Sequence, residues 1–186
     1  YKIVSRANLF LERVEHLEFN VEDDAEEVDV KATFMAEARF LRAYAYFELV
    51  RYWGRVPVAT KSLSAAEAMS TPQSEAQDVY EQVIIPDLQY AIENMKERAY
   101  TSSGGIAESG RATLPAAQAL LGRVYLTMAG FPLYDTSKLS LAKEVLGEVI
   151  TYAEKNNKYW AADSDTWQRI WISDNDNKYH IFEVQY

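Results

Sequence analysis

The residues of this sequence that could perform chemistry are its carboxylates and its two histidines. Asp163 and Asp165 are close neighbours, and a pair of carboxylates can supply the acid and the base of a glycosidase. Neighbouring carboxylates in a loop usually bind solvent or shape a turn, so we interpret this pair as structural. His16 and His180 have no second histidine or cysteine at the spacing of a metal site, and we interpret both as structural or solvated.

Two acidic stretches could bind a cation. Asp174–Asn177 is similar to the start of a calcium loop, but counted from its first residue the sixth and twelfth positions are Tyr179 and Gln185, not glycine and glutamate. The acidic run at 22–27 has the composition of a solvated loop. Cysteine is absent, and no glycine-rich phosphate loop or Gly-x-Ser-x-Gly elbow occurs. The sequence therefore identifies no catalytic residue, no metal site and no cofactor.

Aromatic rings are the remaining candidates for ligand contacts. Ring faces stack on the apolar faces of sugars, while nearby Asp and Asn side chains bind hydroxyl groups. Trp167 and Trp171 are four residues apart, however, and aromatic residues at this spacing more often belong to the core. We therefore interpret the aromatic residues as core. The rings concerned are Tyr52, Trp53, Tyr134, Tyr159, Trp160, Trp167, Trp171, Tyr179 and Tyr186.

Amphipathic periodicity predicts five helices that would position these groups. Apolar residues recur at steps of three and four along five stripes: Ile3, Ala7, Phe10, Val14 and Leu17; Ala36, Phe40, Ala43, Phe47 and Val50; Tyr80, Ile84, Leu88, Ala91 and Met95; Ala117, Leu121, Val124 and Met128; and Ala142, Leu146, Val149 and Ala153. The second helix, from about Asp29 to Trp53, is apolar on more than one side and should be central. Asp29 can cap it and Gly54 can end it. The predicted fold class is mainly α, with tetratricopeptide-like antiparallel helix pairs joined by irregular loops.

Local signals refine these elements. Ser74 and Gln77 have the spacing of a capping box in front of the third helix, and Pro86 should kink or divide that helix. Beyond residue 157 the sequence shows no helical period. Residues 181–186 alternate between apolar and polar types, which predicts a short terminal strand.

Length and charge limit the class of protein. The formal net charge of −9 argues against a nucleic-acid partner, because a phosphate backbone normally needs a basic face. No apolar run is long enough to span a bilayer. The chain starts inside a helical pattern and stops inside an apolar alternation. We therefore expect residues 1–186 to form a single helical domain that is an incomplete part of a longer chain.

The segment from Ala36 to Val58, AEARFLRAYAYFELVRYWGRVPV, closely resembles the SusD/RagB family of outer-membrane nutrient-binding proteins. It combines a helix-borne Glu-Ala-Arg-Phe-Leu-Arg-Ala-Tyr run with a following Gly-x-Val-Pro turn. Further blocks agree in the same order at Ala7–Glu12, Ala116–Leu126 and Ile181–Gln185. The resemblance implies a SusD-like α-α superhelix over nearly the whole chain.

The same resemblance implies a function. It implies a surface-exposed lipoprotein of the outer membrane, anchored through a segment outside this sequence. Such a protein captures oligosaccharides, starch-like or other, and works with a SusC-type TonB-dependent transporter, without catalysis. Some relatives bind peptides instead. The family's ligand contacts lie mostly before the first helix and after the final strand, so the ligand-binding residues of this chain stay unassigned.

Two other functions stay open. An intracellular tetratricopeptide-type adaptor would bind peptides in a helical groove, but this reading leaves the Gly-x-Val-Pro turn unexplained. A helical glycosidase would use Asp163 or Asp165.

Overall fold

The computed structural model describes residues 1–18, 30–95, 111–172 and 179–184. These residues fold mainly into helices, which confirms the predicted class. The chain divides into two compact units, Tyr1–Met95 and Lys96–Tyr186. The expectation of a single domain over 1–186 stays a prediction. The proposed cap Asp29 lies outside the described residues.

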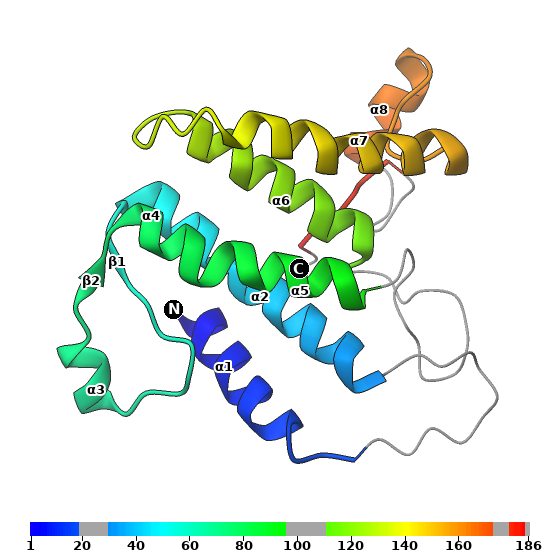
Figure 1. Ribbon diagram of the computed structural model, residues 1–186. Coiled ribbons are helices and arrows are strands. Elements are labelled where there is room, and N and C mark those ends of the chain that lie inside the picture. The colour runs from blue at the N-terminus through cyan, green and yellow to red at the C-terminus, as the bar shows by residue number, and fades with distance from the viewer. Residues whose placement is uncertain (19–29, 96–110, 173–178, 185–186) are drawn as a thin grey trace. The chain divides into compact units, whose positions relative to one another are not determined.

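The first unit is built around one long central helix (Figure 1). α1 (Lys2–Val14) and α5 (Ile85–Asn94) both lie against α2 (Val30–Trp53). The apolar stripe predicted for α2 is confirmed, since all of its members are buried: Ala36, Phe40, Ala43, Phe47 and Val50. Buried side chains occur on its other faces as well, among them Ala38 and Tyr46. This helix is therefore central, as its wide apolar surface predicted.

The buried face of α1 differs from the predicted one. Val4 and the polar residue Asn8 are almost completely buried. Three members of the predicted stripe are instead exposed: Ile3, Phe10 and Leu17. The prediction is wrong for these three because the Asn8 side chain binds backbone groups of another segment, which turns the Val4 and Asn8 edge of the helix inward.

Short elements connect α2 to the next helices. Gly54 ends α2 in the left-handed conformation, with a φ of 68°. β1 (Val56–Pro57) then pairs antiparallel with β2 (Gln73–Ser74), and α3 (Ala65–Ser70) lies between them in the chain.

The capping box of this region belongs to α3. Ser64 Oγ accepts the N–H of Glu67 at 3.3 Å, and the Glu67 carboxylate accepts the N–H of Ser64 at 2.8 Å. The box predicted at Ser74 and Gln77 is wrong. Ser74 belongs to β2, and the Gln77 side chain donates instead to the carboxylate of Glu81 at 3.0 Å.

Pro86 divides the third predicted helix, as its missing N–H led us to expect. α4 (Ala76–Val79) continues into a π-helical turn, η1 (Tyr80–Ile84), and α5 begins at Ile85. Pro86 thus lies in the first turn of α5, directly after the π-helical turn that interrupts the regular α-helical hydrogen bonding in front of the residue without an N–H. The predicted stripe across this division is buried: Tyr80, Ile84, Leu88, Ala91 and Met95.

The second unit is dominated by a helical hairpin, in which α6 (Leu114–Ala129) lies along α7 (Lys138–Asn156) (Figure 1). The predicted stripe of α6 is buried. Of the stripe predicted for α7, Ala142 and Val149 are buried, while Leu146 and Ala153 are partly exposed. Gly122 allows the close approach of the helices, because a Cβ atom there would lie 2.4 Å from Cγ of Leu146.

The C-terminal region departs from its prediction. α8 (Ser164–Ile172) forms in a stretch where we expected no helix. Asp163 caps its first turn. The sequence analysis did not identify this cap, because the surrounding residues are mainly aromatic and acidic and show no helical period. Residues 181–184 are not part of a strand, so the predicted terminal strand is wrong over these residues. Residues 185–186 lie outside the described residues.

Two glycines of the hairpin should respond in opposite ways to alanine. Gly122→Ala is expected to lower the free energy of unfolding by about 1 to 2 kcal/mol, because overpacking against Leu146 exceeds the gain in helix propensity. Gly147→Ala should raise it by about 0.5 to 1 kcal/mol, since its Cβ would meet no atom within 4 Å. Urea denaturation of both variants measures the changes. Changes of the same sign in the unfolding free energies of the two variants would contradict the close contact between Gly122 and Leu146.

Candidate functional site

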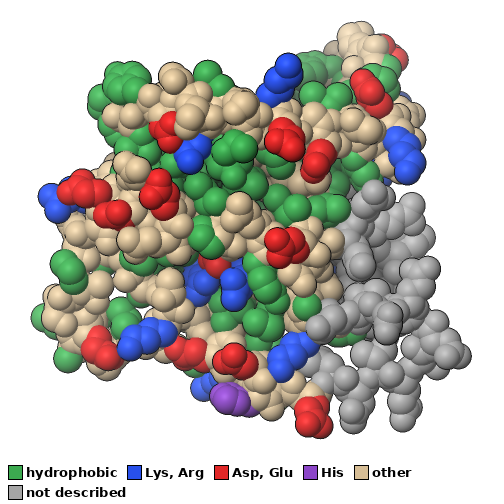
Figure 2. All heavy atoms as spheres, in the orientation of Figure 1, with side chains coloured by type: hydrophobic (Ala, Val, Ile, Leu, Met, Phe, Trp, Pro, Cys, Tyr) green, Lys and Arg blue, Asp and Glu red, His purple; other side chains and the backbone are tan. Residues whose placement is uncertain are grey.

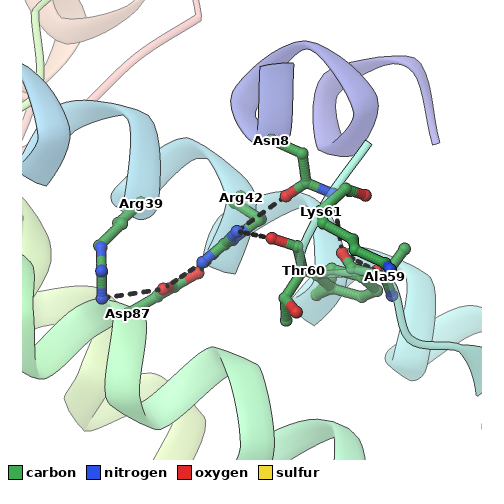
Figure 3. Close-up of polar contacts among 8 residues, drawn as sticks. Asn8, Arg39, Arg42, Ala59, Thr60, Lys61 and Asp87 are labelled. Carbon is green, nitrogen blue, oxygen red and sulfur yellow. Dashed lines mark hydrogen bonds and ion pairs between the residues drawn. The ribbon is translucent and has the colours of Figure 1, made fainter. Parts of the chain in front are cut away.

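A buried polar network joins three helices of the first unit (Figure 3). Arg42 on α2 donates through Nε and Nη2 to the two carboxylate oxygens of Asp87 on α5, at 2.7 and 2.8 Å. Its Nη1 donates to Oδ1 of Asn8 on α1 at 2.7 Å and to the carbonyl oxygen of Thr60 at 3.2 Å. One guanidinium group therefore connects α1, α2, α5 and the segment after β1.

The same network fixes the backbone between β1 and α3. Nδ2 of Asn8 donates to the carbonyl oxygens of Ala59 and Lys61, both at 2.9 Å. The hydroxyl of Tyr46 accepts the N–H of Ala59 at 2.7 Å. The two side chains thus form hydrogen bonds with backbone N–H and carbonyl groups that have no partner in a helix or strand.

Burial governs the electrostatics of the network. Desolvation raises the pKa of Asp87 above its ordinary value, and the hydrogen bonds and charge of Arg42 oppose this rise. Arg39 supplies a second cation, with Nη1 3.8 Å from Asp87 and its guanidinium 4.1 Å from the centre of the Tyr90 ring. Burial likewise raises the pKa of the Tyr46 hydroxyl.

This arrangement is suited to positioning helices and not to binding a ligand. Asn8, Arg42 and Asp87 are 1%, 6% and 2% exposed. The guanidinium of Arg42 already donates to the carboxylate, an amide and a backbone carbonyl inside the protein. The network is therefore a structural centre, which sequence analysis did not identify.

The two candidate acids of a glycosidase have another role in the structure. The Asp163 carboxylate accepts the N–H of Thr166 at 2.8 Å, and this bond holds its pKa below the ordinary value. Asp165 lies exposed in the first turn of α8. A glycosidase acid needs a raised pKa, so the geometry at Asp163 favours a helix cap over an acid catalyst.

Neither histidine belongs to a described cluster of metal-ligand side chains. His16 is exposed after α1, and Nδ1 of His180 contacts the carboxylate of Glu183. Among the residues that the structure describes, no group of three His, Asp or Glu side chains is placed to hold a metal ion. The acidic run at 22–27 and the stretch Asp174–Asn177 lie outside those residues.

Comparison with known proteins identifies the family. The model of the SusD-like family described as "Starch-binding associating with outer membrane" matches residues 1–126, which include the whole network. The chain belongs to the SusD-like family. A SusD-like protein of Bacteroides ovatus is 33% identical over 153 residues. That alignment covers 80% of this chain and 26% of the relative, so the SusD-like chain spans about a quarter of that protein's length.

Solved structures agree with this assignment. A SusD homolog from Bacteroides thetaiotaomicron has a TM-score of 0.72 and 30% identity, and the match covers 89% of this chain and 30% of that one. A laminarin-binding SusD-like protein has a TM-score of 0.68 and 27% identity, over 95% of this chain and 34% of its own. The predicted SusD-like helical superhelix is thereby confirmed.

Several of the aromatic rings that the sequence singled out as candidates for ligand contacts are exposed. Trp167 and Trp171 are 57% and 71% exposed and meet edge to face, with ring centroids 5.9 Å apart. The prediction that they belong to the core is wrong, because α8 buries none of its described side chains. Tyr52 and Trp53, at the end of α2, are also exposed. Tyr186 lies outside the described residues.

The surface of the SusD-like chain mixes charged and apolar side chains, as the face in Figure 2 shows. An apolar hollow of about 550 Å³ lies between α1 and α2. Its lining includes two exposed residues of the stripe predicted for α1, Ile3 and Phe10, together with Leu41 of α2.

None of the described helices has the length and apolar composition needed to cross a membrane.

Proposed function

We propose that this chain is the helical part of a surface-exposed outer-membrane protein that captures oligosaccharides and works with a SusC-type TonB-dependent transporter. The observation that carries the proposal is the match of residues 1–126 to a starch-binding family. The laminarin-binding neighbour supports a glycan as the ligand. A lipid anchor would be attached to a segment outside residues 1–186.

The structure supports a binding protein better than an enzyme. The Arg42 network fixes the register of α1, α2 and α5 without leaving reactive groups in a pocket. A rigid helical frame of this kind can present binding loops and a docking surface to a transporter. The lowered pKa of Asp163 is opposite to that of a glycosidase acid.

The full-length protein tests this proposal. We expect it to be retarded in native gels that contain starch or laminarin, to bind at least one glycan on an array, and to release no reducing sugar from that glycan. Serum albumin in the same gel is the control. A TonB-dependent transporter should co-purify with it from outer membranes. Binding to arrayed peptides together with a silent glycan array would overturn glycan capture and favour peptide recognition.

A further inference from the structure

A groove of about 550 Å³ with both polar and apolar lining residues lies between α6 and α7 in the second unit. Gln118 lines it from α6, and Glu144, Glu148, Thr151 and Lys155 line it from α7. Gln118 is only 8% exposed, and its Nε2 donates to the carboxylate of Glu148 at 2.5 Å. The position of this carboxylate is therefore set by a buried side chain before any ligand arrives.

The groove also has an apolar side, formed by Leu114, Pro115 and Tyr152. The Tyr152 ring lies 6.0 Å from that of Tyr159, measured between centroids, and this contact helps to fix its plane. Carboxylates, an amide, a hydroxyl and an ammonium group beside apolar carbon suit a sugar, which has hydroxyl edges and C–H faces. A docking helix would need a continuous apolar stripe, which the charged residues of this groove interrupt.

Gly147 keeps the groove open. It lies in the interior of α7, where glycine is about 1 kcal/mol less favourable than alanine. Close packing does not require it, since a Cβ atom at Gly147 would meet nothing within 4 Å, whereas one at Gly122 would lie 2.4 Å from Leu146. The missing side chain at Gly147 therefore benefits the groove and not the contact between the two helices.

We propose that the groove between α6 and α7 is an oligosaccharide subsite that takes a short stretch of a glycan. A sugar ring would lie over Gly147, with its hydroxyl groups directed to Glu148 and Lys155 and its C–H face toward the apolar side at Tyr152. The inference rests on the proposed function and deepens it, because it places ligand contacts inside residues 1–186. The Glu148 carboxylate of the subsite is held in advance by Gln118, as the polar groups of small-molecule sites generally are.

Two substitutions in the full-length protein separate occupation of the groove from stability. Gly147→Phe projects a ring into the open space of the groove, while Ile150→Phe places a ring at a 58% exposed position of α7 that does not line the groove. Isothermal titration calorimetry uses laminarin or starch oligosaccharides, or the array glycan that the parent protein binds most tightly. We expect Gly147→Phe to bind at least about ten-fold more weakly than the parent and Ile150→Phe to stay within about two-fold. Neither variant should melt below the parent.

Each other outcome has a distinct meaning. Equal affinities of the two variants for a glycan that the parent binds would overturn the subsite and leave the proposed function standing. A parent protein that binds no glycan would overturn the proposed function, and the subsite with it. A lowered melting temperature for Gly147→Phe alone would show that another part of the polypeptide fills the groove, which also overturns the subsite.

Discussion

Replacing Arg42 with methionine is expected to lower the free energy of unfolding by about 3 to 5 kcal/mol. Methionine keeps much of the side-chain length but donates no hydrogen bond. Asp87, only 2% exposed, would lose both of its bonds to Arg42, and Asn8 and Thr60 would each lose a donor. A buried carboxylate without its partner is strongly destabilising. Urea denaturation of the full-length parent and variant measures the loss.

Arg51→Met is the matched control on the same helix. Arg51 pairs with Glu48 at 2.8 Å, but both side chains are partly exposed, and ion pairs of this kind contribute little. We expect its loss to stay below about 1 kcal/mol. Similar losses at Arg42 and Arg51 would contradict the structural importance of the buried network.

The loss of unfolding free energy caused by Arg42→Met should also depend on pH. Burial already raises the folded-state pKa of Asp87 above 3.8, and removing Arg42 raises it further. A carboxyl group with a raised folded-state pKa stabilises the fold in its protonated form. The penalty is therefore greatest at neutral pH, declines as the pH falls through the folded-state pKa, and is relieved below the unfolded value. The difference between parent and variant should be smaller at about pH 4 than at neutral pH. A difference independent of pH would contradict this explanation.

The long helices could be predicted because burial imposes a period on the sequence. The stripe from Ala36 to Val50 identified the buried face of α2, and the stripe from Tyr80 to Met95 persisted through the division at Pro86. The effect of Pro86 could be predicted because a proline lacks the backbone N–H that an α-helix needs, whatever the surrounding sequence. The residue order around Gly54 supplied the family, which the match to residues 1–126 confirmed.

Tertiary pairing decided the features that could not be predicted. Asn8 and Arg42 are polar residues in helices. The burial of Arg42 is favourable because it pairs with Asp87, far along the chain, and that of Asn8 because it binds Arg42 and backbone carbonyl groups of another segment. The face of α1 was misplaced for this reason. Ser74 pairs with β1 and therefore does not cap a helix. Asp163 caps α8, although the residues that follow it show no helical period in the sequence.

Phe47→Ala is expected to lower the free energy of unfolding by about 3 to 5 kcal/mol. Phe47 is 0% exposed, and its ring meets Tyr80 edge to face, with centroids 6.3 Å apart. Its removal would leave a cavity between α2 and the π-helical turn. The helices cannot easily close this cavity, because the bonds between Arg42 and Asp87 hold α2 and α5 in register. Urea denaturation is again the measurement.

Phe131→Ala is the control, since Phe131 is 78% exposed in the turn between α6 and α7 and should change stability by no more than about 0.5 kcal/mol. A loss of unfolding free energy below about 1 kcal/mol for Phe47→Ala would contradict the proposed packing.

The double variant Phe47→Ala with Arg42→Met tests whether the network prevents the cavity from closing. If it does, the double variant should lose less unfolding free energy than the sum of the two single variants. A strictly additive double variant would show instead that the network and the apolar core of α2 act independently.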